Sequence, residues 1–181
     1  MTRGGEGMIR LERLGPAHLE EILAGQDEVL AQEIVGRPWD RESLGDFLGR
    51  CERWREGGPL QEFAALETGT GRLLGGGGLN RLAPDLAPRQ VALTYWLLAD
   101  ARGHGLGIPL ARALLARARS LPPRRGATAR EAVLVIAPEN TASQAVATQL
   151  RARPTGEAVP HPTDSARRAE RWLVDLEPDA S

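Results

Sequence analysis

The hexapeptide Arg102-Gly103-His104-Gly105-Leu106-Gly107 limits what this chain can fold into more than any other stretch. It follows an apolar run, VALTYWLL (Val91–Leu98), and precedes a helical pattern that starts near Leu106. A strand, a glycine-rich turn and a helix N-terminus together form an anion site, because glycines let the backbone approach a ligand and the first helical N–H groups are unpaired. The sequence therefore predicts a phosphate-bearing ligand at this turn.

Two common nucleotide motifs do not fit the turn. A dinucleotide-binding fingerprint needs Gly-x-Gly-x-x-Gly in the first βα unit and an acidic residue about 20 positions later. Here Gly103, Gly105 and Gly107 are spaced by two, and the turn follows the fourth predicted strand. A P-loop is also excluded, because no Gly-Lys-Ser/Thr follows the glycines.

The alternation of apolar and polar residues predicts a mixed α/β domain over residues 8–177. The expected strands are 8–14, 62–67, 72–82, 90–98 and 132–137, followed by a closing hairpin of 154–161 and 169–176. The expected helices begin at Pro16 and cover 42–55, 106–121 and 140–150. The order is β-αα-βββ-α-β-α-ββ, with the strand 90–98 at the centre. The glycine run 75–78 indicates a bulge or a close backbone approach.

Composition narrows the function classes. A net charge of -1 gives no sign of a nucleic-acid binder, and no apolar run reaches the roughly 20 residues of a membrane span. The single Cys, Cys51, cannot form an internal disulfide and is interpreted as a core residue. One Cys and three His spread along the chain do not have the spacing of a structural zinc site. Residues 1–7 and 178–181 are expected to be flexible tails. The N-terminus lacks a signal-peptide core, so a cytoplasmic location is expected.

Two motifs in sequence order carry a family resemblance. Arg102, Gly105 and Gly107 fill the pattern Gln/Arg-x-x-Gly-x-Gly/Ala, and Asn140 and Ser143, after AVLVIAPE, fill Asn-x-x-Ser/Ala. In these motifs and in its order of elements, the chain resembles the GNAT N-acetyltransferases over about 9–176. The resemblance implies a mixed, mostly antiparallel central sheet of about seven strands flanked by helices.

The resemblance also implies a cofactor, acetyl-CoA, held between two strands that splay apart. The backbone of Leu97 and Leu98 would contact the pantetheine, and an N–H there, assigned to Leu97, would polarise the thioester carbonyl as a catalytic group. Asn140 and Ser143 would lie beside the pantetheine and the sulfur. The turn residues expected to wrap the pyrophosphate are Arg102, Gly103, His104, Gly105, Leu106 and Gly107. The alternative interpretation of His104 is a solvated side chain without a role in binding.

Within the family, the pattern from Asn140 to Leu150 resembles the ribosomal-protein-alanine branch. Many relatives carry a Tyr acid seven residues after the Asn, but this chain has Ala147 there, and Ser143 is the proposed acid. The alternative for Ser143 is a hydroxyl that bonds helix backbone or cofactor. Trp39, in an Arg-Pro-Trp loop, and Tyr95 are the candidate substrate-binding residues. Trp39 is interpreted equally well as a ring that covers the edge of the core.

Two departures from the family keep rival functions open. The first is Arg151-Ala152, which replaces the family's usual Gly-Phe after the last helix. The second is that the strand before the glycine turn carries no carboxylate to act as general base. The remaining candidates for the base are Glu62, Glu67, Asp85 or a water chain. The leading hypothesis is direct acetyl transfer to a primary amine, first a protein N-terminus and second a small amine such as an aminoglycoside, a polyamine or an amino acid. The rival is a non-catalytic acyl-CoA-binding regulatory or assembly module. A homodimer is common in this family, but no stretch indicates an interface.

Overall fold

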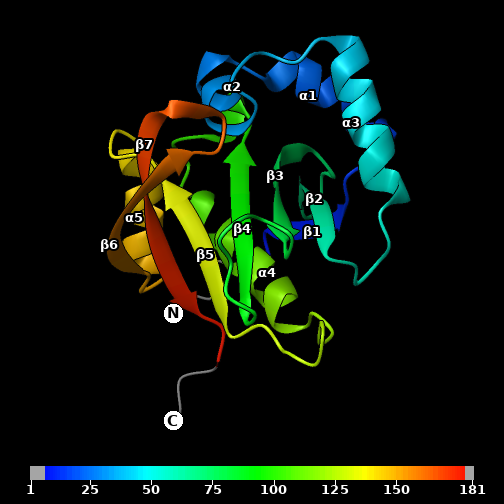
Figure 1. Ribbon diagram of the computed structural model, residues 1–181. Helices are drawn as coiled ribbons and strands as arrows, with labels where there is room; N and C mark the ends of the chain where they lie inside the picture. Colours follow the sequence, from blue (N-terminus) through cyan, green and yellow to red (C-terminus); the bar gives the residue numbers. More distant parts are fainter. Residues whose placement is uncertain (1–6, 178–181) are drawn as a thin grey trace, which may run out of the picture.

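The computed structural model describes residues 7–177, which form a seven-stranded sheet with helices on both faces (Figure 1). The strand order is β1-β2-β3-β4-β5-β7-β6, and every neighbouring pair is antiparallel except β4 with β5. The predicted mixed, mostly antiparallel sheet is confirmed, and β4 is its central strand. The predicted tails lie outside the described residues, apart from Gly7.

The strands are β1 (Ile9–Arg13), β2 (Leu60–Glu67), β3 (Leu73–Asn80), β4 (Gln90–Leu97), β5 (Glu131–Ile136), β6 (Arg153–His161) and β7 (Asp164–Asp175). The α-helices are α1 (Leu19–Gly25), α2 (Glu28–Ile34), α3 (Arg41–Arg53), α4 (Gly107–Arg119) and α5 (Thr141–Gln149), and short 3-10 turns cover Pro16–His18 and Ala99–Ala101. No helix within residues 7–177 is both long and apolar enough to cross a bilayer.

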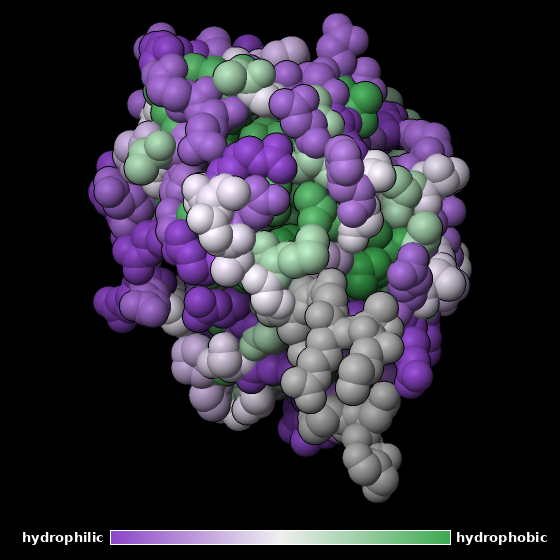
Figure 2. Space-filling model, turned by 180° about the vertical axis from the view of Figure 1, so that it is seen from behind, coloured by the Kyte–Doolittle hydropathy of each residue, from purple (hydrophilic) through white to green (hydrophobic). Residues whose placement is uncertain are grey.

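Two apolar clusters lie on opposite faces of the sheet. Leu93 and Leu79 pack with Leu110 and Leu114 of α4, and this cluster also includes Ala147 of α5. On the other face, Ala64 and Leu98 pack with side chains of α1, α2 and α3. Odd-numbered residues of β4 therefore point to the α4–α5 face and even-numbered ones to the α1–α3 face, as strand alternation requires. The back view in Figure 2 shows a surface that is mostly polar at its rim, with apolar residues gathered near its centre.

The glycine run of β3 is explained by close neighbours. A Cβ at Gly76 would lie 2.6 Å from the Trp96 indole, and a Cβ at Gly77 would lie 2.5 Å from Leu114 Cδ1. At Gly78 it would lie 2.2 Å from a carboxylate oxygen of Glu62. Side chains from both faces thus cross directly over β3, which confirms the predicted close approach. The register of β2 with β3 also shifts between Ala65 and Leu66, where Leu74 of β3 is skipped, so this pairing is irregular.

The sequence pattern missed one helix and misplaced the start of one strand. The sequence pattern predicted two helices before the second strand, but α2 is an additional one, of seven residues. Asp27 caps it by accepting a bond from the Leu30 N–H, and Leu30 packs into the core. The closing hairpin has a two-residue connection, because β7 begins at Asp164 and not at residue 169.

The central parallel pair separates along its length. β4 and β5 pair only from Gln90 to Ala92 and from Glu131 to Val133 within the described residues. Beyond these pairs, β4 continues to Leu97 against β3, and β5 continues to Ile136 against β7. We call the space between Leu93–Leu97 and Leu134–Ile136 the β4–β5 gap. The splayed strands expected from the family resemblance are therefore present.

Candidate functional site

The register of β4 decides which backbone groups face the β4–β5 gap. The Leu98 N–H donates to the Leu74 carbonyl at 2.9 Å, and the Leu98 carbonyl accepts from the Ala101 N–H. Hydrogen-bonded pairs alternate along an antiparallel ladder, so the N–H and C=O groups of Leu97 and Tyr95 point away from β3 toward the gap. This agrees with the sequence-based choice of Leu97. The Leu98 N–H and carbonyl already bond Leu74 and Ala101, and contact of Leu98 with pantetheine remains a prediction.

The glycine turn lies at the end of β4 that leads into the gap. Gly103 and Gly105 have φ values of +78° and +74°, and a Cβ at either position would meet nothing within 4 Å. Glycine is required there by the backbone conformation, and the side facing outward is open to a ligand. His104 is exposed, whereas Leu106 is buried against Leu74 and Ala101 and anchors the turn.

The N-terminus of α4 has no side-chain cap and no acidic residue in its first turn. Its unpaired N–H groups and the positive end of the helix dipole therefore remain available to an anion. Gly107 has a different function from the other two glycines: a Cβ there would lie 3.0 Å from Val146 of α5. It permits close packing of α4 on α5.

Arg102 is held by an acidic partner from the other face. Its guanidinium forms an ion pair with the carboxylate of Asp27, the N-cap of α2. Although partial burial opposes ionisation, the Leu30 N–H and Arg102 together lower the pKa of Asp27. Arg102 therefore connects the turn to α2, and contact of its side chain with a cofactor remains a prediction.

Asn140 and Ser143 form the entrance to α5. Asn140 is the N-cap of α5, at the start of the helix predicted over 140–150, and its side-chain oxygen accepts from the Ser143 N–H at 3.0 Å. The Asn140 amide group also donates to Glu33 Oε2 of α2 at 3.2 Å. Ser143 is partly buried in the first turn of the helix, on the side that faces β4 and Tyr95. The structure thus places this second motif at the β4–β5 gap.

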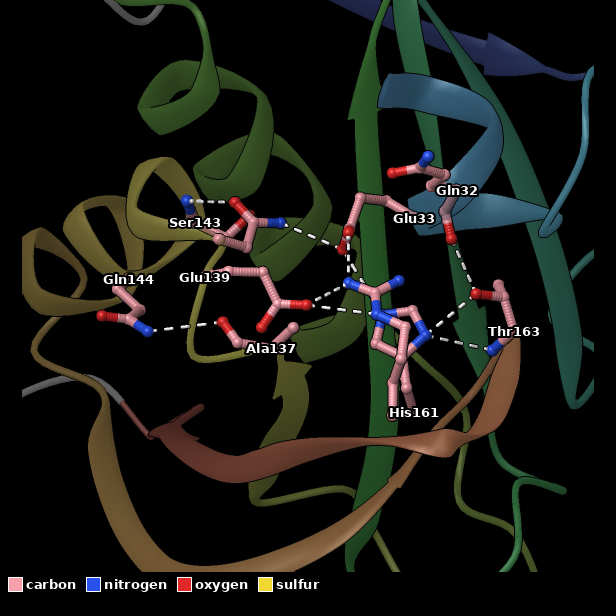
Figure 3. A network of polar contacts seen from close by, with 10 residues as sticks. Gln32, Glu33, Ala137, Glu139, Ser143, Gln144, His161 and Thr163 are labelled. Carbon is pink, nitrogen blue, oxygen red and sulfur yellow. Dashed lines mark hydrogen bonds and ion pairs between the residues drawn. The ribbon is translucent and has the colours of Figure 1, made fainter. Parts of the chain in front are cut away.

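Sequence reasoning missed a polar network that spans the same end of the sheet (Figure 3). Glu33 accepts from Arg167 of β7 at 2.9 Å, and Arg167 also donates to Glu139 at 2.6 Å. His161 is buried, with Nε2 3.4 Å from Glu33 Oε2 and Nδ1 accepting from the Thr163 N–H. The network joins α2, the start of α5 and the β6–β7 connection. Glu33 lies more than 100 positions before its partners Asn140, His161 and Arg167 in the sequence, so no local pattern indicates the network.

The two candidate substrate residues have different surroundings. Trp39 stacks on Phe47 with ring centroids 5.3 Å apart. The side-chain amide of Gln26 donates to the Trp39 carbonyl and accepts from the Trp39 N–H, both at 2.8 Å. This favours the interpretation of Trp39 as a ring at the edge of the core. Tyr95 points to the α4–α5 face, beside Ser143.

Of the three carboxylates suggested as general base, only Glu62 has a suitable environment. Burial raises the pKa of Glu62 to about 7, and its carboxyl group lies over Gly78 near Cys51 of α3. Glu67 instead accepts from the Thr70 hydroxyl at 2.6 Å, which lowers its pKa. Asp85 lies in the loop between β3 and β4.

Comparison with known proteins agrees with this geometry. The family model described as an acetyltransferase (GNAT) domain matches residues 9–153. No curated protein sequence matches the chain significantly. Among solved structures, spermidine N-acetyltransferase from Vibrio cholerae, in complex with CoA and spermine, is 13% identical with a TM-score of 0.73, covering 93% of this chain and 96% of that one.

An acetyltransferase (GNAT family) from Bacillus anthracis is 14% identical with a TM-score of 0.74, covering 97% of this chain and 98% of that one. Both likenesses concern the fold, and the family model adds the sequence signature over most of the chain. The chain therefore belongs to the GNAT acetyltransferase family.

Proposed function

We propose that the protein transfers the acetyl group of acetyl-CoA directly to a primary amine at a protein N-terminus. The observation that carries the proposal is the β4–β5 gap, which has an open glycine turn at one end and Asn140 and Ser143 at its side. GNAT acetyltransferases use acetyl-CoA, whose thioester supplies an activated acetyl group. No nucleophile of the enzyme is required.

The residues present fit this cofactor. Unpaired backbone groups of Leu97 and Tyr95 face the gap and can bond an extended pantetheine in the way that another strand would. The open backbone of Gly103 and Gly105 and the uncapped start of α4 suit a pyrophosphate. The Leu97 N–H would bond the thioester carbonyl oxygen and stabilise the charge that develops on it.

The acceptor is expected to enter from the α1–α3 face, opposite the cofactor. An ammonium group must lose a proton before it can attack, and a base with a pKa near the working pH does this best. Glu62 meets that condition, with a pKa of about 7. Its carboxyl group lies over Gly78 of β3, which pairs with Thr94 and not with Leu97, so a chain of water molecules would carry the proton to it.

The charges near the gap favour an acceptor with a single ammonium group. Glu33 and Glu139 are both paired with Arg167, and Asp27 is paired with Arg102. A polycation would need unpaired acids along its binding groove. These three acids are therefore not free to bind a second ammonium group, and Glu62 is taken as the base, which supports a peptide N-terminus over a polyamine or an aminoglycoside.

A polyamine is the second candidate acceptor, because the Vibrio cholerae enzyme of the same fold was solved with spermine. A cytoplasmic location and a homodimer remain predictions.

The test is release of free thiol from acetyl-CoA with a panel of acceptors. The panel contains peptides with free and with blocked N-termini, spermidine, spermine, an aminoglycoside and single amino acids. Turnover is expected with free peptide N-termini and not with blocked ones. Turnover confined to spermidine and spermine would overturn the proposed acceptor. Binding of acetyl-CoA without turnover on the whole panel would favour a non-catalytic acyl-CoA-binding module.

A further inference from the structure

A hollow of about 300 Å³ lies at the end of the sheet opposite the glycine turn. It is bordered by the connection from α3 to β2, the residue after β3 and the stretch after α4. In Figure 1 the arrowhead of β4 points toward α2, and the stretch between α4 and β5 lies at the other end of the sheet. The lining includes Arg55, Arg81 and Arg124, and none of the lining residues, all within 7–177, is acidic. We call this site the arginine hollow.

Arg81 joins the three segments that border the hollow. Its backbone N–H donates to the Pro59 carbonyl at 2.8 Å. Its guanidinium donates to the carbonyls of Pro122 and Ala127, at 2.6 Å and 2.9 Å. Arg81 is only 8% exposed, yet within residues 7–177 it forms no ion pair with a carboxylate. The fold therefore holds a buried cation in place with neutral partners alone.

The neighbours of this cation are further cations. Burial lowers the pKa of Arg81, and the nearby Arg124 lowers it further. Arg124 donates to the Arg81 carbonyl at 3.4 Å, and Arg55 is exposed at the same hollow. Among the residues that the structure describes, neither of these two forms an ion pair with a carboxylate. A buried charge beside like charges is unfavourable until an anion offsets it.

We propose that the arginine hollow binds the phosphate group of a small phosphate monoester. Planar guanidinium groups donate paired hydrogen bonds to oxyanions, and three of them match a phosphate dianion better than the single charge of a carboxylate. The volume is at the lower end for small-molecule sites, so an organic group can accompany the phosphate. Pro59, Pro122 and Pro123 line the hollow and would contact that group.

The proposal goes beyond acetyl transfer and does not depend on it. A purely structural role is sufficient for Arg81, because this side chain fastens the stretch after α4. It does not explain why Arg124 and Arg55 lie at the same hollow without a carboxylate partner in the described part of the chain. A bound dianion would explain all three guanidinium groups.

Calorimetric titration of the full chain in a buffer without phosphate tests the proposal. The probes are phenyl phosphate, inorganic phosphate and benzoate. We expect phenyl phosphate to bind most tightly, because it alone offers both a dianion and an apolar ring. Equal affinity for inorganic phosphate would overturn the monoester and leave the free ion as the ligand. Equal affinity for benzoate, or no saturable binding of any probe, would overturn the phosphate site.

Arg124→Gln and Arg55→Gln each remove one guanidinium and leave Arg81, which the fold needs, in place. We expect the Kd for phenyl phosphate to rise about tenfold or more in Arg124→Gln. The rise should be smaller in Arg55→Gln, because Arg55 is exposed. Arg125→Gln is the matched control, since Arg125 is the next residue and is exposed but does not line the hollow. Equal Kd values in Arg124→Gln and Arg125→Gln, both shown to be folded by thermal unfolding, would contradict the proposal.

The glycine turn is the other place where a phosphate could bind, and Gly105→Glu separates the two sites. We expect this variant to keep the wild-type Kd for phenyl phosphate while it loses coenzyme A. If Gly105→Glu lost phenyl phosphate and Arg124→Gln retained it, the phosphate would lie at the turn and the proposal would be wrong. Failure of the proposed acetyl transfer is recognised separately, because it appears in thiol release and not in these titrations.

Discussion

The guanidinium of Arg102 and the carboxylate of Asp27 form an ion pair that joins the glycine turn to the N-terminus of α2. Asp27 thus has two tasks, because it also caps α2 by accepting from the Leu30 N–H at 2.9 Å. One side chain thus connects the turn predicted to bind the cofactor with α2, the helix that carries Glu33 of the polar network.

Two substitutions separate the tasks of Asp27. Asp27→Asn keeps an oxygen for the cap and loses the ion pair, and since both partners are partly exposed we expect a loss of less than about 1 kcal/mol of unfolding free energy. Asp27→Ala loses both, and we expect about 1 kcal/mol more. Urea unfolding at pH 7 measures both values. An equal loss in the two variants would contradict a capping role.

The Asp27→Asn comparison also has a defined pH dependence. The pKa of Asp27 is lowered in the folded protein, so the charge stabilises the fold above the ordinary pKa of an aspartate. That contribution is lost as the pH falls through the lowered pKa. The difference between wild type and Asp27→Asn should therefore shrink in acid.

The glycine turn is tested by a charge at Gly105. Gly105→Glu would put a carboxylate where the pyrophosphate is proposed to lie, and we expect coenzyme A binding measured by calorimetry to be abolished. Gly126→Glu is the matched control, because Gly126 has a φ of +77° and is equally open, but lies in the loop after α4. Both variants carry the same backbone strain. Unchanged affinity in Gly105→Glu would remove the turn from the cofactor site.

Local signals were enough for most of the fold. The helical pattern over 42–55 predicted α3, and Asp40 begins this helix as its N-cap by accepting from the Ser43 N–H at 2.8 Å. The long apolar strand 90–98 was correctly placed at the centre of the sheet. By contrast, α2 has only seven residues, and a helix that short depends on its cap and on tertiary packing more than on its sequence pattern.

The candidate site was predictable only in part. Motif spacing predicted the turn and Asn140, but it did not predict which backbone groups of β4 face the gap. The register of β4 with β3 decides this: the backbone N–H of Leu97 faces the gap, whereas that of Leu98 bonds the Leu74 carbonyl. The pairing of Glu33 with Arg167 and Asn140 is a tertiary contact between distant segments, which sequence reasoning from one chain does not reveal.

The glycine run of β3 predicts a steep cost for one added methyl group. A Cβ at Gly77 would lie 2.5 Å from the Thr94 carbonyl oxygen and from Leu114 Cδ1, so strand and helix would both have to move. We expect Gly77→Ala to lower the unfolding free energy by about 1–3 kcal/mol. Gly49→Ala is the control: Gly49 lies within α3, and the nearest atom to a Cβ there is the end of the Arg53 side chain at 3.6 Å. Its expected effect is a gain of about 0.5–1 kcal/mol in the same thermal or urea unfolding experiment.

The buried carboxyl of Glu62 predicts opposite effects on stability and activity. Its pKa of about 7 in the folded protein lies above the ordinary 4.5, so the fold binds a proton that the unfolded chain releases. Stability therefore falls as the pH rises from about 4.5 to 7, by up to a total on the order of 3 kcal/mol. Glu62→Gln is always neutral, so at pH 8 it should be more stable than wild type and at pH 4 about equal. Its kcat at neutral pH should fall, because the proposed base is gone.

Glu67→Gln on the same strand should change stability in the other direction. Glu67 is bonded to Thr70 and lies 3.6 Å from Arg72, and these contacts lower its pKa, so removal of its charge should cost a little stability at pH 8. Thermal unfolding of the three proteins from pH 4 to pH 8 makes the comparison. If Glu62→Gln differed from wild type by the same amount at both pH values, the Glu62 carboxyl would not titrate in this range. It would then be unsuited to take a proton from the amine, and a water chain leading elsewhere would have to serve as the base.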